Sequence, residues 1–92
     1  MKDFQIESAK EVPISDILDK LNIPYKSVGG QIKIPCLFHE EYNGSLTIYE
    51  DNHFYCFGCN ESGDNIKLIR RILPELTFTE SVELINLIGE GN

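Results

Sequence analysis

The sequence predicts a small α+β domain in which helices flank a short antiparallel sheet. Two observations predict this class. Stretches with apolar residues at helical spacing lie near both ends of the chain, and short alternating segments separated by turn residues lie between them. In the same middle region, all three cysteines and one histidine form two pairs, Cys36 with His39 and Cys56 with Cys59. The sheet is therefore expected to be tied together at these four residues.

The spacing of the two pairs is typical of a closed structural zinc site. A two-residue gap inside each pair lets a tight turn direct both side chains at one ion. Sixteen residues separate the pairs, which is enough for two short strands and a turn at about 3.3 Å per strand residue. We predict one structural zinc ion bound by Cys36, His39, Cys56 and Cys59. Four protein ligands leave no open position for a reactive water, so no catalytic residue is predicted.

Length, cysteine count and charge restrict the function further. A 92-residue chain is marginal on hydrophobic burial alone, and a metal is a common supplement. Three cysteines cannot complete a disulfide framework, and the sequence has neither a secretory signal nor a membrane-length apolar run. We therefore expect a reducing, cytoplasmic setting and no membrane partner. A net charge of −7 excludes a strong global attraction to duplex DNA, so any nucleic-acid contact must be local.

The first half of the chain divides into an arm, a helix and a hairpin. Residues 1–12 are polar and are expected to form a loose or lightly docked N-terminal arm, with the folded domain spanning residues 13–92. Pro13 is expected to open a helix, and Pro24 ends it. Strands are predicted at residues 25–28 and 31–34. Gly29 and Gly30 between them indicate a two-residue hairpin turn.

The second half is expected to complete the sheet and add two helices. Strands are predicted at residues 45–50 and 53–56, and residues 60–64 are interpreted as a polar turn. A helix from about residue 66 is stopped by Pro74. The last helix begins with a capping box formed by Thr77 and Glu80.

Two stretches of the sequence resemble the zinc-binding domain of bacterial and phage DNA primases. They are residues 35–40 and residues 55–66, where a Cys-Phe-Gly-Cys knuckle precedes Ser-Gly-Asp and an apolar helix. The resemblance extends from about residue 14 to residue 88. It implies a zinc ribbon on a small antiparallel sheet flanked by helices. It also implies that residues 13–92 form a primase-type zinc-binding domain.

The resemblance implies that the chain binds single-stranded DNA template and supports primer synthesis. Polymerisation would belong to a separate primase catalytic domain or another replication protein, so the chain is not expected to be an enzyme by itself. The expected DNA-binding residues lie on the outward face of the sheet, where lysines can contact phosphates and tyrosines can stack on bases. They are Lys26, Lys33, Tyr49 and Tyr55, with Tyr25 as a further aromatic on the same strands.

Other residues receive structural interpretations. The cluster of Lys67, Arg70 and Arg71 is interpreted mainly as the solvated face of an amphipathic helix. His53 lacks the paired spacing of a ligand and is expected to be a surface or packing residue. The aromatic residues Phe38, Phe54 and Phe57 are expected to fill the core. An alternative function also stays open, a zinc-stabilised protein-interaction module that does not bind DNA.

Overall fold

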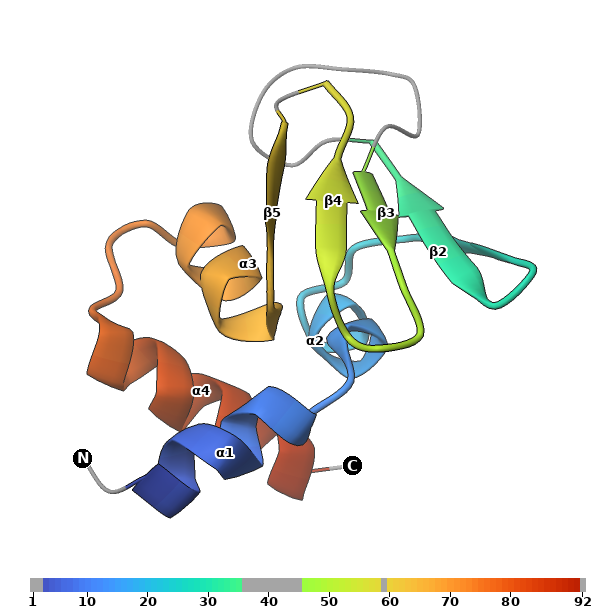
Figure 1. Cartoon of the computed structure of the whole chain (residues 1–92). Helices are drawn as coiled ribbons and strands as arrows, with labels where there is room; N and C mark the ends of the chain where they lie inside the picture. Colours follow the sequence, from blue (N-terminus) through green and yellow to red (C-terminus); the bar gives the residue numbers. More distant parts are fainter. Residues whose placement is uncertain (1–2, 36–45, 59, 92) are drawn as a thin grey trace.

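The computed structural model describes residues 3–35, 46–58 and 60–91. These residues form four helices and a five-stranded antiparallel sheet, which confirms the predicted α+β class (Figure 1). No helix in these ranges is long and apolar enough to span a membrane. The helices are α1 (Asp3–Glu11), α2 (Ile14–Lys20), α3 (Asn65–Ile72) and α4 (Phe78–Glu90); the strands are β1 (Lys26–Val28), β2 (Gln31–Ile34), β3 (Leu46–Ile48), β4 (Phe54–Cys56) and β5 (Glu61–Gly63).

The sheet is a meander in which each strand pairs with the next one along the chain, in the order β1-β2-β3-β4-β5. The predicted hairpin is confirmed, because Gly29 and Gly30 have φ values of +57° and +83°. Positive φ at both central residues is the requirement of a type I′ turn, which matches the twist of the flanking strands. A Cβ at Gly30 would meet only the flexible end of the Glu50 side chain, so the positive φ is what favours glycine there.

The interpretation of residues 60–64 as a plain turn was wrong for most of that segment. Glu61–Gly63 forms β5, which pairs with β4 and completes the sheet. The chain reverses direction directly after β4, where Asn60 adopts a left-handed conformation with φ of +58°. Asparagine tolerates this conformation better than most residues. A three-residue polar strand carries no hydrophobic alternation, and this is why the sequence pattern did not reveal it.

Two hydrophobic clusters share the interior. The first lies between the inward face of the sheet and α2, and its largest fully buried side chain is that of Phe54. The second lies among the four helices and includes Ile17, Ile69 and Ile85. Helices α2 and α3 contribute to both clusters, Leu68 of α3 to the first and Ile69 to the second. These two helices therefore join the sheet to the helical layer.

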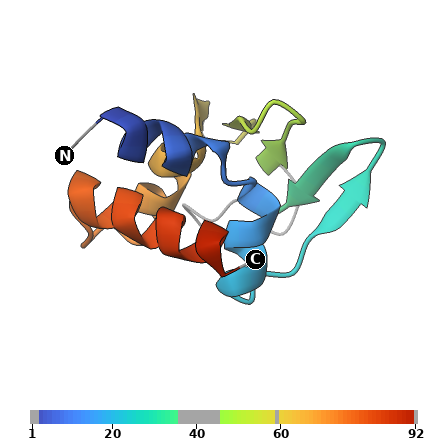
Figure 2. The ribbon, with the colours of Figure 1, turned by 90° about the horizontal axis from the view of Figure 1, so that it is seen from below.

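Residues 3–11 form α1, where the sequence suggested a loose or lightly docked arm. Helix α1 lies beside α4 (Figures 1 and 2), and Ala9 is fully buried between the helices. Its last carbonyl groups have no partners within the helix. Two asparagines from distant elements bond them, since Asn65 Nδ2 donates to the carbonyls of Ala9 (2.7 Å) and Val12 (2.8 Å), and Asn52 Nδ2 to those of Lys10 (3.0 Å) and Val12 (2.8 Å).

The helix signals read from the sequence are confirmed at the start of α4. Thr77 Oγ1 accepts from the backbone N–H of Glu80 at 3.1 Å, and Glu80 Oε1 accepts from the N–H of Thr77 at 2.9 Å. This is the predicted capping box. Helix α2 begins at Ile14 with Pro13 as its N-cap, and Asp64 caps α3 by accepting from the N–H of Lys67 at 3.0 Å.

Candidate zinc site and nucleic-acid face

One predicted zinc ligand, Cys56, lies at an end of the sheet where three strands begin or end. The pairing register aligns Ile34 with Leu46, Leu46 with Cys56, and Cys56 with Glu61 in one row across four strands. Strand β2 ends in this row, β3 begins in it, and β4 ends in it. The end of β2 and the beginning of β3 therefore lie at the end of the sheet where Cys56 lies.

Cys56 is the one predicted ligand that falls within the described residues, and its surroundings fit a metal site. It is fully buried and belongs to the inner cluster of the sheet. The backbone N–H of Asn60 donates to the Cys56 carbonyl at 2.8 Å, which closes the turn that follows the strand. Cys36, His39 and Cys59 lie outside the described residues. The set of three thiols and one imidazole is the chemistry that zinc prefers.

His53 lies away from this end, as expected from the sequence. Its side chain is 58% exposed, and its Nδ1 lies 3.4 Å from the Asp51 carboxylate. His53 directly precedes β4 whereas Cys56 ends it, so about 10 Å of extended chain separates them. Across residues 3–35, 46–58 and 60–91, no group of three or more His, Cys, Asp and Glu side chains is placed to hold a metal.

The proposed DNA-contacting residues align on the opposite face of the sheet. The register pairs Lys26 with Lys33, Lys33 with Thr47, Thr47 with Tyr55, and Tyr55 with Ser62. Alternation along each strand places this row on the face away from the cluster that contains Phe54 and Cys56. The row crosses all five strands, a distance of about 19 Å at roughly 4.8 Å per strand.

Hydrogen bonds hold part of this row in place. Thr47 is only 1% exposed, and the Lys33 ammonium donates to its hydroxyl at 3.5 Å. The Tyr55 hydroxyl donates to Asn60 Oδ1 at 2.9 Å. Lys26 is exposed at the edge of the sheet. The face therefore presents two exposed cations on one side of a buried threonine and a partly exposed aromatic ring on its other side.

Phe57 extends this aromatic surface, and its assignment to the core was wrong. Its side chain is 60% exposed, and its ring meets that of Tyr55 edge-on, with centroids 4.7 Å apart. Phe57 follows the end of β4 and packs on the ring of the outward-facing Tyr55 rather than on the core. Phe54 is buried as predicted, and Phe38 lies outside the described residues. The i, i+2 spacing of Tyr55 and Phe57 was the signal that would have found this pair.

Tyr49 and Tyr25, the other two tyrosines considered for the DNA-binding face, differ in how they are placed on the sheet. Tyr49 directly follows β3, and its N–H donates to the His53 carbonyl at 2.8 Å, so the outward alternation continues through it. Tyr25 packs against the inner cluster, and its hydroxyl donates to Asp19 at 3.5 Å. Desolvation, and then the charge of Asp19, raises the pKa of Tyr25 above its usual value near 10. Tyr25 therefore packs against the core and contributes little to the outward face.

Comparison with known proteins places the chain in a family. Residues 2–89 match a family model described as CHC2 zinc finger. The chain is 36% identical over 90 residues to the DNA primase of Buchnera aphidicola subsp. Baizongia pistaciae, an alignment that covers 96% of this chain and 15% of that protein. It is 33% identical over 85 residues to the DNA primase of Streptomyces coelicolor, covering 90% of this chain and 13% of that one.

A solved structure has the same fold. The crystal structure of the Aquifex aeolicus primase, comprising its zinc binding and RNA polymerase domains, matches with a TM-score of 0.75 and 24% identity. The match covers 92% of this chain and 21% of that chain. In the comparison with the Buchnera primase, a curated relative, the chain spans about 15% of the length of that protein. Since the family model covers nearly all of the 92 residues, the chain belongs to the CHC2 zinc finger family, as a zinc-binding domain of the DNA primase type.

Proposed function

We propose that this domain binds single-stranded DNA weakly through the outward face of its sheet and supports primer synthesis by a separate primase catalytic domain or another replication protein. The observation that carries the proposal is the cross-strand row that contains Lys26, Lys33 and Tyr55. Membership of the CHC2 zinc finger family and similarity to DNA primases give it direction.

One structural zinc ion is part of the proposal, bound by Cys36, His39, Cys56 and Cys59. When bound, zinc supplies a closed tetrahedral crosslink and no catalysis, because four protein ligands complete its coordination. The buried thiol of Cys56 fits this role, since it lies where β2, β3 and β4 meet at one end of the sheet.

The chemistry of the outward face suits a weak and sequence-tolerant contact. Lys26 and Lys33 can each neutralise a phosphate, and the rings of Tyr55 and Phe57 can stack on bases. Stacking on an aromatic side chain is worth roughly 1–3 kcal/mol per base. Two phosphate contacts predict a shallow slope of about −1.4 for log K against log salt, at about 0.7 per phosphate on a single strand.

Reversing the charge of the two lysines tests whether the outward face of the sheet binds DNA. We expect Lys26→Glu/Lys33→Glu to abolish measurable binding of a labelled, 5′-hydroxyl oligonucleotide at low salt, because the attraction becomes repulsion. Fluorescence anisotropy at two salt concentrations measures both the affinity and the slope. The matched control is Lys67→Glu/Arg70→Glu, which changes the net charge by the same amount on a helix away from the sheet face.

Two results would refute the sheet face as the binding surface. One is equal loss of binding in the control variant, which would show that overall charge decides the affinity. The other is an absence of binding by the parent protein even at low salt. The second result would favour the protein-interaction module, with the exposed Val28 and Phe57 as contact residues on the same strands and turn.

Primer synthesis requires a second polypeptide or domain under this proposal. We expect no nucleotide incorporation by the purified 92-residue chain, since the described residues contain no cluster of carboxylates placed to hold catalytic metal ions. Primer synthesis by a primase catalytic domain that lacks its own zinc-binding domain should rise when this chain is added. Metal-dependent incorporation by the chain alone would contradict the accessory role.

A further inference from the structure

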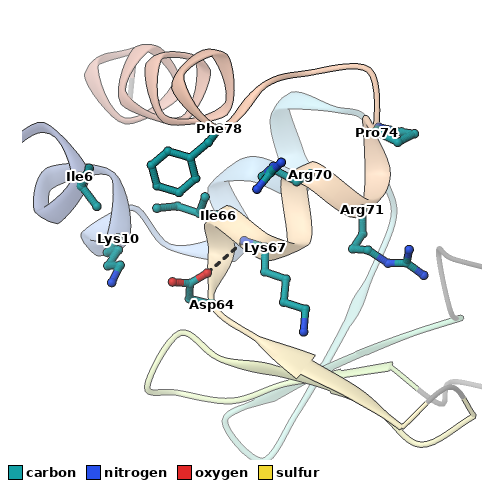
Figure 3. A pocket seen from close by; sticks show the side chains of 9 residues that line it. All are labelled: Ile6, Lys10, Asp64, Ile66, Lys67, Arg70, Arg71, Pro74 and Phe78. Carbon is teal, nitrogen blue, oxygen red and sulfur yellow. Dashed lines mark hydrogen bonds between the residues drawn. The ribbon is translucent and has the colours of Figure 1, made fainter. Parts of the chain in front are cut away.

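A cavity of about 560 Å³ lies between α1, α3 and the beginning of α4 (Figure 3). Its lining includes four cationic side chains, those of Lys10, Lys67, Arg70 and Arg71, as well as Phe78. From the sequence, the three cations of α3 were interpreted as a solvated helix face. The structure adds Lys10 from α1 and an aromatic ring from α4, so three separate helices build the cavity.

The concentration of positive charge here is unusual for so acidic a chain. The protein has eight Lys and Arg residues and a net charge of −7, and four of those eight line this one cavity. Arg71 pairs with Glu61 at 3.0 Å. In the described part of the chain, Lys10, Lys67 and Arg70 form no ion pair with a carboxylate. The cavity therefore holds cations that are available to an anionic ligand.

The remaining lining groups suit the other parts of a nucleotide. Phe78 is 40% exposed, and the guanidinium carbon of Arg70 lies 5.9 Å from the centre of its ring. A planar base can extend such an aromatic–guanidinium stack. Asp64 uses Oδ1 to cap α3, and its carboxylate can also accept from a sugar hydroxyl. Figure 3 shows Phe78 and Arg70 nearer α4, and Asp64 and Lys67 nearer the sheet.

We propose that this cavity binds a nucleoside phosphate, either free or at the 5′ end of a short oligonucleotide. Lys10 and Lys67, which form no ion pair with a carboxylate in the described part of the chain, would contact the phosphates, as lysines do in phosphate sites. Phe78 and Arg70 would contact the base. The volume is in the range of small-ligand pockets.

The test is a titration of the zinc-loaded chain with ATP, followed by backbone amide shifts in NMR. We expect saturable shifts at Lys67, Arg70 and Phe78, with an affinity that falls at least about tenfold in Lys67→Glu, because a charge-assisted contact becomes repulsive. Lys10→Glu, on a different helix, should weaken binding in the same direction. Lys26→Glu/Lys33→Glu should leave ATP binding unchanged, so this inference and the sheet-face proposal can fail separately.

Two further comparisons define the ligand. Phe78→Leu should weaken ATP binding but leave the binding of inorganic tripolyphosphate unchanged, since only the base needs the ring. Competition among ATP, a 5′-triphosphorylated trinucleotide and a 5′-hydroxyl trinucleotide distinguishes a free nucleotide from the 5′ end of a strand. The tighter binder of the first two is the ligand class, and the proposal requires that it bind more tightly than the 5′-hydroxyl strand. The proposal is overturned if ATP causes no saturable shift at millimolar concentration or if Lys67→Glu binds like the parent. Displacement of ATP by a tighter-binding polyglutamate peptide would also overturn it, in favour of an acidic protein segment.

Discussion

Removal of zinc is expected to unfold the domain. Both hydrophobic clusters are small, and β2, β3 and β4 each begin or end at the row of Ile34, Leu46 and Cys56, where the proposed zinc ion would crosslink them. A structural zinc ion can contribute about 10 kcal/mol to such a domain, which is comparable to its whole free energy of unfolding. A chelator should therefore abolish the far-ultraviolet circular dichroism of the folded state and the cooperative thermal transition.

The two histidines provide a matched pair of variants for this experiment. His39→Ala should lose zinc, as measured by elemental analysis, together with the folded state. His53→Ala should keep both, because the side chain of His53 is 58% exposed and lies beyond the opposite end of β4 from Cys56. An unchanged melting curve after complete chelation, or full zinc content in His39→Ala, would contradict the proposed ligand set.

Local signals in the sequence predicted most of the elements correctly. The Gly29-Gly30 turn and the capping box of Thr77 and Glu80 are confirmed, since each depends on residues that are adjacent or three apart. Strand bounds were less accurate. The predicted strand at residues 45–50 is described as β3, Leu46–Ile48, because pairing with both neighbours decides where a strand ends.

Elements that depend on distant partners could not be predicted in this way. The conformation of β5 depends on pairing with β4, and its own residues carry no apolar alternation. Helix α1 has a weak apolar stripe, and its stability depends on α4 and on carbonyl partners forty or more positions away in the sequence. No local sequence pattern indicates that Asn52 and Asn65 both donate hydrogen bonds to carbonyls at the end of α1.

The candidate sites also differ in whether local sequence signals or contacts between distant residues determine them. Alternation along single strands was enough to place Lys33 and Tyr55 on the outward face, and their alignment in one row came from the register. The cavity was not foreseeable, because Lys10 and Phe78 are brought to α3 by the packing of separate helices. Phe57 was misplaced because its position in the turn, rather than its hydrophobicity, decides its exposure.

Asn65 should therefore be one of the most sensitive positions outside the metal site. It is fully buried, and its Nδ2 donates to the carbonyls of Ala9 and Val12 at 2.7 and 2.8 Å. Asn65→Ala removes both bonds and leaves two carbonyls at the end of α1 with fewer donors in a dry environment. Each carbonyl keeps a second donor, the Val12 N–H for Ala9 and Asn52 Nδ2 for Val12. Each net hydrogen bond is worth about 1 kcal/mol, so the expected loss is about 2 kcal/mol in the free energy of unfolding.

Urea denaturation at saturating zinc measures this loss without a contribution from metal release. Asn86→Ala is the matched control, because Asn86 Nδ2 also ties α4 to α1 but makes a single bond, to the Gln5 carbonyl at 3.1 Å, and is only partly buried. We expect a loss of about 1 kcal/mol for the control. Equal losses in the two variants would show that the end of α1 does not depend on Asn65. A larger loss in Asn65→Ala would show that one buried amide holds α1 onto the domain core.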